Sequence, residues 1–270
     1  MEEHMAPRVL ISDKLSPLAE QVFKERGVAF DVKVGLDKDE LGKIIGDYDG
    51  LAVRSATKAT EKIIAKADKL KVIGRAGIGV DNIDIAAATA RGIIVMNTPF
   101  GNSITTAEHA ISLILALARQ IPAADASTQA GKWEKSAFLG IEVTGKTLGI
   151  IGCGNIGSIV ADRAIALRMK VIAFDPFLSP ERALDIGVEK VDLDELLARA
   201  DFISLHTPLT DKTRNIIDAD ALKKTKKGVR IVNCARGGLI VEEALKAALA
   251  SGQVAGAALD VFSEEPAKDN

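Results

Sequence analysis

Hydrophobic and polar positions alternate along the first hundred residues in two different periods. Short runs rich in Val, Ile and Ala are separated by longer stretches with helical spacing, such as residues 17–26 and 38–45. This alternation predicts βαβ units and therefore a parallel sheet with covering helices. The strands expected here are residues 9–12, 29–34, 50–54, 72–75 and 93–96.

A second alternating series begins at Gly145, after a break in the pattern. Turn residues at 97–103 interrupt the first series, and a long apolar helix is expected at 104–119. The fold class predicted is α/β, with two Rossmann-like, doubly wound parallel-sheet domains at residues 5–99 and 100–270. The strands expected in the second domain are residues 147–151, 170–174, 202–205, 230–233 and 254–259.

The helix at 104–119 is apolar nearly all round, which predicts burial on more than one side. An interdomain or subunit contact would cover the second side, but a central helix of one large core fits the periodicity equally well. Asn102, Ser103 or Thr105 is expected to cap its start, and Thr105 with Glu108 has capping-box spacing.

Composition excludes several classes of protein. The 35 basic and 37 acidic residues give a net charge of -2, which argues against nucleic-acid binding driven by bulk charge. The most apolar window, residues 110–118, is too short to cross a membrane, and the first residues do not resemble a secretory signal. Two cysteines without metal-site spacing favour a reducing, cytoplasmic location and no bound metal.

The segment from Gly152 to Gly157 has the pattern Gly-x-Gly-x-x-Gly between an expected strand and an expected helix at 158–168. Such glycines allow a tight turn and close approach to a pyrophosphate, and the helix offers free N–H groups. Asp175 ends the next strand, where its carboxylate can bind ribose hydroxyls and repel a 2′-phosphate, so NAD is favoured over NADP. A glycine-rich turn in an unrelated α/β fold is the alternative. The expected cofactor residues in this part are Gly152, Gly154, Asn155, Ile156, Gly157 and Asp175, with Thr207 and Pro208 on the nicotinamide side.

Five further segments carry a family resemblance: residues 53–57, 74–82, 96–103, 233–238 and 258–266. With them, the chain resembles the D-2-hydroxyacid dehydrogenases along almost its whole length, and specifically the branch that acts on 3-phosphoglycerate. The resemblance implies a first domain that closes over substrate and a second that holds NAD. It also implies oxidation of 3-phospho-D-glycerate to 3-phosphohydroxypyruvate, the first step of phosphorylated serine biosynthesis, by a homo-oligomer (dimer or tetramer).

The same resemblance assigns individual roles. Arg236 would bind the substrate carboxylate and carbonyl, Glu265 would orient a catalytic histidine, and Asp260 would lie near the nicotinamide. Arg54 and Arg75 could hold the phosphate, although solvated strand ends or structural ion pairs are the alternative. Backbone N–H groups around Gly77 could hold the carboxylate. The remaining expected site residues are Cys234 and Ala235 for the cofactor, and Ser55, Ile78 and Asn102 for the substrate.

The family places its acid–base histidine beyond the segment at 258–266, and the sequence stops at Asn270. Of the histidines present, His4 is terminal, His109 is expected as a buried structural imidazole, and His206 belongs to the cofactor loop. The chain alone is therefore expected to bind NAD and turn over very slowly. The alternatives are a sibling enzyme acting on glycerate, hydroxypyruvate or D-lactate, and a non-catalytic NAD-binding regulatory module.

Overall fold

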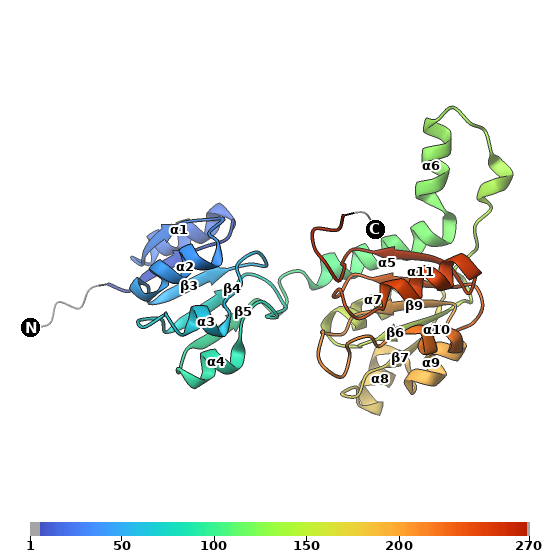
Figure 1. Cartoon of the computed structure of the whole chain (residues 1–270). Coiled ribbons are helices and arrows are strands. Elements are labelled where there is room, and N and C mark those ends of the chain that lie inside the picture. Colours follow the sequence, from blue (N-terminus) through green and yellow to red (C-terminus); the bar gives the residue numbers. More distant parts are fainter. Residues whose placement is uncertain (1–5, 269–270) are drawn as a thin grey trace, which may run out of the picture. The chain divides into compact units, whose positions relative to one another are not determined.

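The computed structural model describes residues 6–268, which form two compact units that divide between Asn102 and Ser103 (Figure 1). The boundary expected from the sequence, after residue 99, lies just before this division. The predicted outer limits at residues 5 and 270, and His4, lie outside the described residues. Each unit is a parallel sheet with helices on it, so the predicted α/β class with two Rossmann-like sheets is confirmed.

The first unit contains a five-stranded parallel sheet in the order β2-β1-β3-β4-β5. Its interior strand positions are apolar, and Leu10, Leu51 and Ile73 are fully buried. Ser16, Asp37 and Asp84 accept backbone N–H groups at the starts of α1, α2 and α4, which fixes where those helices begin. The strands are β1 (Arg8–Ile11), β2 (Ala29–Val32), β3 (Gly50–Val53), β4 (Val72–Arg75) and β5 (Ile94–Asn97); the helices are α1 (Pro17–Glu25), α2 (Lys38–Ile44), η1 (Ile45–Asp47), α3 (Glu61–Ile64) and α4 (Ile85–Ala90).

The second unit contains a six-stranded parallel sheet in the order β11-β10-β9-β6-β7-β8. Alternate residues of a strand point to opposite faces, so Ile150 packs with α5 and α7 while Ile151 packs with α9, α10 and α11. The strands are β6 (Thr147–Ile151), β7 (Lys170–Phe174), β8 (Glu189–Lys190), β9 (Phe202–Leu205), β10 (Val229–Asn233) and β11 (Val254–Leu259). The helices are α5 (Ser103–Arg119), α6 (Ile121–Gln129), η2 (Lys135–Phe138), α7 (Asn155–Ala166), α8 (Pro180–Ile186), α9 (Leu193–Arg199), α10 (Ala219–Lys224) and α11 (Glu242–Ser251).

Strand order decides where each sheet can bind a ligand. In an open parallel sheet, ligands bind beyond the carboxyl ends of the strands, at the point where the strand order reverses direction. That point lies between β1 and β3 in the first unit and between β6 and β9 in the second. The loops that follow these four strands are therefore the places to look for function.

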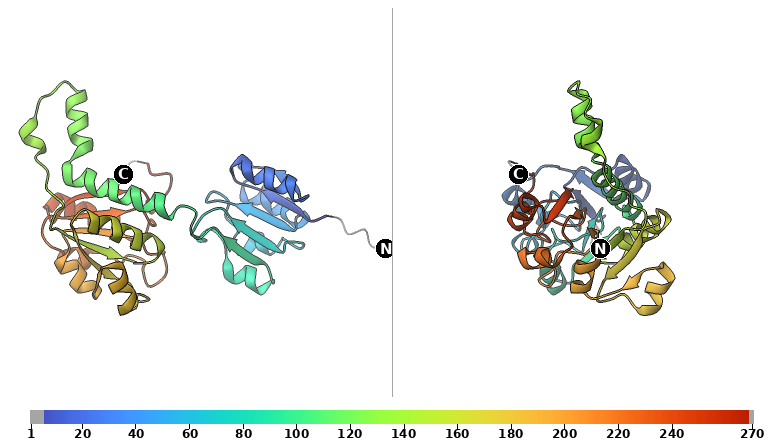
Figure 2. Two further views of the ribbon diagram at one scale, coloured as in Figure 1. Left: turned by 180° about the vertical axis from the view of Figure 1, so that it is seen from behind. Right: turned by 90° about the vertical axis from the view of Figure 1, so that its right-hand side faces the viewer.

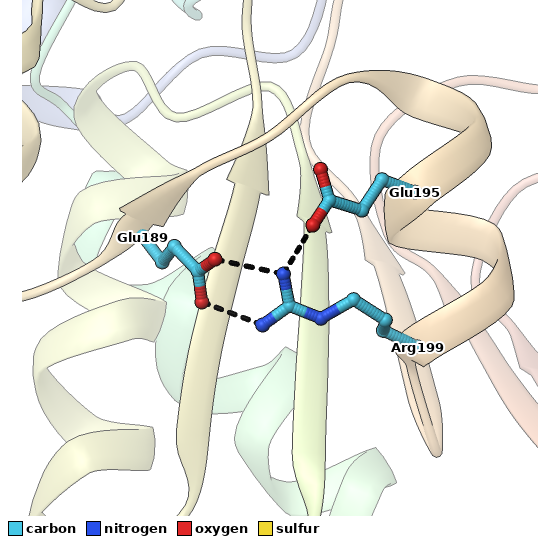
Figure 3. A network of polar contacts seen from close by, with 3 residues as sticks. All are labelled: Glu189, Glu195 and Arg199. Carbon is cyan, nitrogen blue, oxygen red and sulfur yellow. Dashed lines mark hydrogen bonds and ion pairs between the residues drawn. The ribbon is translucent and has the colours of Figure 1, made fainter.

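The short edge strand β8 is tied to the following helix by one arginine. Arg199, at the end of α9, donates to both carboxylate oxygens of Glu189 at 2.7 and 2.6 Å and also to Glu195 (Figure 3). These bonds hold the pKa of Glu189 below its usual range. All three side chains are about half exposed to solvent, so the network contributes little to the free energy of unfolding. Its effect is to fix the position of β8 relative to α9.

Helix α5 differs from its prediction at the start and along its sides. It begins at Ser103, so Thr105 already lies within the first turn and the expected capping box with Glu108 is wrong. One stripe is fully buried, formed by Ala107, Ala110 and Ile114 with Ser103 and Ala118, and it packs on α7. The rest of the helix surface is half-buried or exposed within the chain, so burial on more than one side is not achieved by the chain alone.

Residues 120–140, here called the arm, lead away from the body of the second unit (Figure 2). The chain turns out of α5 at Gln120, which has a left-handed φ of 54°, and Pro122 then starts α6 in a new direction. It returns at Gly140, and the next N–H, of Ile141, donates to the oxygen of Ala118 at 2.8 Å. The arm is thus a loop closed at its base.

Candidate cofactor and substrate sites

Each glycine of the 152–157 loop meets a different steric demand. Gly152 has a φ of 91°, and a Cβ there would lie 2.8 Å from the backbone of His206 and Thr207. A Cβ on Gly157 would overlap the carbonyl oxygen of Gly152. At Gly154 no protein atom lies within 4 Å of the Cβ position. The protein's own packing therefore needs the first and third glycines, whereas the second leaves space that a closely approaching ligand would fill.

Helix α7 begins at Asn155, earlier than the predicted start at residue 158. Its N-cap is Gly154, and no side chain caps the first turn. The first N–H groups of a helix have no partner within the helix, and their partial positive charge suits an anion. Asn155, Ile156 and Gly157 lie in this turn, so the predicted cofactor residues offer backbone donors where a pyrophosphate would bind.

Asp175 follows β7 and faces the glycine loop. Its Oδ2 accepts the Cys153 N–H at 2.8 Å, and its Oδ1 accepts the Phe177 N–H at 2.8 Å. A carboxylate has about four lone-pair sites, so two remain for ribose hydroxyls. Asp175 can therefore hold the glycine loop and a ribose together. Cys153 is buried, and burial with the nearby Asp175 charge raises the pKa of its thiol to about 11, so the thiol stays protonated near pH 7.

The loop after β9 contains the predicted residues Thr207 and Pro208, next to the glycine loop. The Pro208 carbonyl accepts the Thr213 hydroxyl at 2.6 Å, which fixes the loop's course. His206 bonds through Nε2 to Ser204 Oγ at 2.8 Å, and its buried Nδ1 finds no hydrogen-bond partner within residues 6–268. Burial lowers the pKa of His206 to about 4, so the ring is neutral near pH 7.

The loops after β10 and β11 bring together the next group of predicted residues. Asp260 donates its backbone N–H to the oxygen of Asn233 at 3.0 Å, which ties the two loops. Burial, together with the negative charge of Asp260, raises the pKa of the Cys234 thiol to about 12. His109 lies 3.6 Å from Asp260, with 46% of its side chain exposed, so the prediction of a buried structural imidazole is wrong. The helix exposes that face because its buried stripe runs along the other side.

Arg236 is shaped by its own loop and by Asn233. The buried Asn233 donates to the oxygen of Arg236 at 2.9 Å and accepts the N–H of Ala235 at 3.0 Å. The guanidinium of Arg236 donates to the Ala235 carbonyl at 2.6 Å. A Cβ on Gly237 would overlap the oxygen of Phe262, so this loop lies directly against the segment that carries Glu265.

The segment carrying Glu265 is held from α11. Glu242 accepts both the N–H and the hydroxyl of Ser263, at 2.7 and 2.8 Å. Glu265 is exposed and accepts the Phe262 N–H at 3.2 Å. The two predicted catalytic residues, Arg236 and Glu265, therefore lie on adjoining loops at one edge of the sheet.

In the first unit the predicted substrate residues lie at the carboxyl edge of its sheet. Arg54 and Ser55 follow β3 and are exposed, and Arg75 ends β4. A Cβ on Gly77 would overlap Nη1 of Arg75, so the guanidinium lies over that glycine. Ile78 is held by its carbonyl, which accepts the Asn97 side-chain amide at 2.7 Å. Asn102 is exposed at the end of the unit, where no specific contact assigns it a role.

Four residues that organise these loops were not expected from the sequence. Asp13 and Asn82 bind the backbone of the Arg54 loop, Asn233 binds that of the Arg236 loop, and Glu242 holds the Glu265 segment. For Asp13, Asn233 and Glu242, a position at or just beyond a strand end or helix start was the available signal, whereas Asn82 lies within a loop. Single side chains whose partners lie far away in the sequence, however, form no recognisable motif.

Comparison with known proteins decides the family. Residues 111–270 match the NAD-binding domain of the D-isomer specific 2-hydroxyacid dehydrogenases. The chain belongs to this family. It is 52% identical over 96% of its length to D-3-phosphoglycerate dehydrogenase of Synechocystis sp. and 51% identical over 97% to that of Homo sapiens. It covers 47% and 49% of those two proteins, so it spans about half of their length.

Solved structures of the family agree with this fold. A glyoxylate reductase from Paecilomyes thermophila superposes with a TM-score of 0.90 at 35% identity, over 98% of this chain and 84% of that one. D-lactate dehydrogenase from Aquifex aeolicus, in a complex with NAD and lactic acid, gives 0.86 at 29% identity, over 96% and 78%. For a member of this family, the open position at Gly154 and the uncapped start of α7 are the features that fit NAD.

Proposed function

We propose that the protein containing this chain is an NAD-dependent dehydrogenase that oxidises 3-phospho-D-glycerate to 3-phosphohydroxypyruvate, the entry reaction of phosphorylated serine biosynthesis. The observation that carries the proposal is the identity of about half of all residues, over nearly the whole chain, to proteins named D-3-phosphoglycerate dehydrogenase. Two arginines at the ends of neighbouring strands, Arg54 just after β3 and Arg75 at the end of β4, supply the positive charge that a phosphorylated acid requires.

Each group at the site has a task in this reaction. A bound NAD would supply the acceptor for the hydride that leaves C2 of the substrate. The Gly152–Gly157 loop and Asp175 bind and orient the dinucleotide, while Thr207, Pro208, Cys234, Ala235 and Asp260 line the edge beside it. Arg236 binds the substrate carboxylate and stabilises negative charge on the carbonyl oxygen that forms. Ser55, Gly77, Ile78 and Asn102 complete the substrate side.

Proton removal from the C2 hydroxyl needs a general base with a pKa near the working pH. His206 does not fit, because its low pKa and its bond to Ser204 leave a weakly basic, buried ring. We therefore expect His206→Gln to leave the pH profile of kcat unchanged. Glu265 would act on a histidine rather than on the substrate, fixing its tautomer and favouring its protonated form.

The test compares substrates in the protein at its natural length. NADH absorbance at saturating NAD gives kcat/KM for 3-phosphoglycerate, D-glycerate and D-lactate. Arg54→Gln should reduce kcat/KM for 3-phosphoglycerate at least about tenfold, since a charge-assisted hydrogen bond contributes ~1.5–3 kcal/mol, and should affect D-glycerate little. A preference for an unphosphorylated acid would instead assign the protein to a sibling activity. The absence of turnover with every acid would favour an NAD-binding module.

We also propose that the protein is a homo-oligomer in the cytoplasm. The arm supports the first point because α6 has no buried residue and Trp133 and Leu139 are 86% and 76% exposed. Large exposed apolar side chains gathered on one segment are typical of an interaction surface. Trp133→Lys should lower the mass measured by sedimentation velocity, whereas Trp133→Phe should not.

The two free thiols, Cys153 and Cys234, agree with a reducing compartment. Within residues 6–268, no helix is long and apolar enough to span a bilayer.

A further inference from the structure

The loop after β3, from Arg54 to Thr57, is held from below by a buried acid. Asp13 follows β1 and is only 6% exposed. Its Oδ2 accepts the Arg54 N–H at 2.6 Å, and its Oδ1 accepts the Thr57 hydroxyl at 2.7 Å. The Thr57 N–H points at both oxygens, at 3.1 and 3.2 Å. Ser12 adds a contact of 2.9 Å to the same hydroxyl.

The same loop is held from its other side by an amide. Asn82 Nδ2 donates to the carbonyl oxygens of Arg54 and Thr57, both at 2.7 Å. Its Oδ1 accepts Nε of Arg75 at 3.0 Å. These neighbours fix the orientation of the amide, because two acceptors face its nitrogen and one donor faces its oxygen. Asn82 therefore links the backbone of Arg54 to the side chain of Arg75.

The bonds of Asp13 lie at the place in the first sheet where a ligand is expected to bind. Asp13 follows β1 and Arg54 follows β3, so they flank the point where the strand order of this sheet reverses. A buried carboxylate is costly unless its oxygens are hydrogen-bonded, and an apolar residue would pack this place without that cost. A negative charge is also unfavourable close to a site for an anionic substrate. What Asp13 supplies in return is a defined backbone at residues 54 and 57.

We propose that Asp13 and Asn82 are positioning residues that hold the Arg54–Thr57 loop in its substrate-binding conformation and couple it to Arg75. The inference rests on the proposed function, because it takes Arg54 and Arg75 as the groups that bind the phosphorylated acid. Neither residue touches substrate. Each acts through the backbone of the loop, and Asn82 also acts through the guanidinium that it orients.

The first test measures the loop without using activity. In the protein at its natural length, hydrogen–deuterium exchange of a peptide spanning residues 54–57 should be at least about tenfold faster in Asp13→Asn, because the Arg54 and Thr57 N–H groups lose a charged acceptor. Asn82→Asp should also speed the exchange, because it replaces the amide nitrogen that donates to the two carbonyls with a carboxylate oxygen that repels them. Asp68→Asn is the control, because Asp68 pairs with Arg91 on the surface of the same unit. Unchanged exchange in Asp13→Asn would overturn the proposal.

The second test asks whether the effect passes through Arg54. Asp13→Asn should raise KM for 3-phosphoglycerate about tenfold, with kcat and the Kd for NAD nearly unchanged. In an Arg54→Gln background the same change should have little further effect, since residues that act as a unit are not additive. An equal rise in KM in both backgrounds, or a loss of kcat and thermal stability with KM unchanged, would reduce Asp13 to a structural role. A wild-type protein that prefers an unphosphorylated acid would refute the proposed function, while the exchange result would still decide the positioning role.

Discussion

Gly154 and Gly157 lie three residues apart in one loop, but the protein needs them for different reasons. Gly154→Ala should lower the free energy of unfolding by only about 0.5–1 kcal/mol, because the Cβ enters open space and the remaining cost is that of an alanine at the N-cap. NAD affinity should fall at least tenfold, roughly 1.4 kcal/mol, because the methyl occupies the place of the pyrophosphate. Urea unfolding and calorimetric NAD titration measure the two effects.

Gly157→Ala is the matched comparison. Its methyl would overlap the oxygen of Gly152, so the loop must move, and the free energy of unfolding should fall by about 1–3 kcal/mol. If Gly154→Ala destabilised the fold as much as Gly157→Ala, the position at 154 would be a packing requirement and no sign of a ligand.

His206 makes stability depend on pH. Its folded pKa of about 4 lies below the unfolded value, so stability is full above about pH 6.5 and is lost as pH falls towards 4. Between pH 7.5 and pH 5 the loss should be about 2 kcal/mol. The urea midpoint should shift between the two pH values in wild type, and it should shift less in His206→Gln. Equal pH slopes would mean that the ring is not buried as a neutral group.

At this scale, motifs and the resemblance pointed to charged residues at motif positions, but not to the residues that organise the loops through contacts distant in the sequence. Asp175 and Arg236 were proposed because a motif or a resemblance includes them, and their roles stay predictions. Asp13 was missed because the groups it binds lie 41 and 44 residues away in the chain. Such a partnership exists only after the strands are paired. His109 was placed wrongly because an apolar helix sequence does not reveal which side faces the core.

The arm can be tested as an element through the glycine at its base. Gly140 has a φ of 62°, and a Cβ there would lie 2.5 Å from the Ala118 oxygen. Gly131, inside the arm, has a similar φ of 73° with no atom within 4 Å. Gly131→Ala should therefore cost about 1 kcal/mol from backbone strain alone. Gly140→Ala should cost roughly 1–3 kcal/mol more through overlap.

Circular dichroism during urea unfolding would measure both variants. Equal losses of stability would show that the arm is not closed tightly at Ala118.

Elements such as this arm were harder to predict than the strands. Buried parallel strands appear as short apolar runs, whereas the left-handed turn at Gln120 has no composition signal and β8 has only two residues.

At the scale of the whole molecule, the two units have separate cores. The first unit packs around residues such as Ile73, and the second contains all the expected NAD-binding residues. NAD at 100 times its Kd should therefore stabilise the second unit by about 2.7 kcal/mol and leave the first unit nearly unchanged. Calorimetry with and without NAD should show one transition moving.

Ile73→Val identifies the other transition. It should destabilise the first unit by about 1 kcal/mol without altering the shift that NAD causes. A single transition that moves as a whole with both changes would show that the units unfold together.

The parallel sheets and the division into two units were foreseeable from alternating apolar runs. The orders of the strands within the sheets were not foreseeable, because β1 pairs directly with β3 although β2 lies between them in the sequence.

The bonds of Asp175 to Cys153 and Phe177 have a consequence for protein engineering. To make the proposed enzyme accept NADP, the obvious step is to remove this acid and its repulsion of a 2′-phosphate. Here that step would also release the backbone of the cofactor loop. A redesign that keeps an acceptor for the Cys153 N–H, such as Asp175→Asn or Asp175→Ser, should therefore retain more dinucleotide affinity than Asp175→Ala. In the proposed role of Asp175, both the choice between NAD and NADP and the order of the glycine loop depend on this one side chain, so a useful NADP variant must separate them.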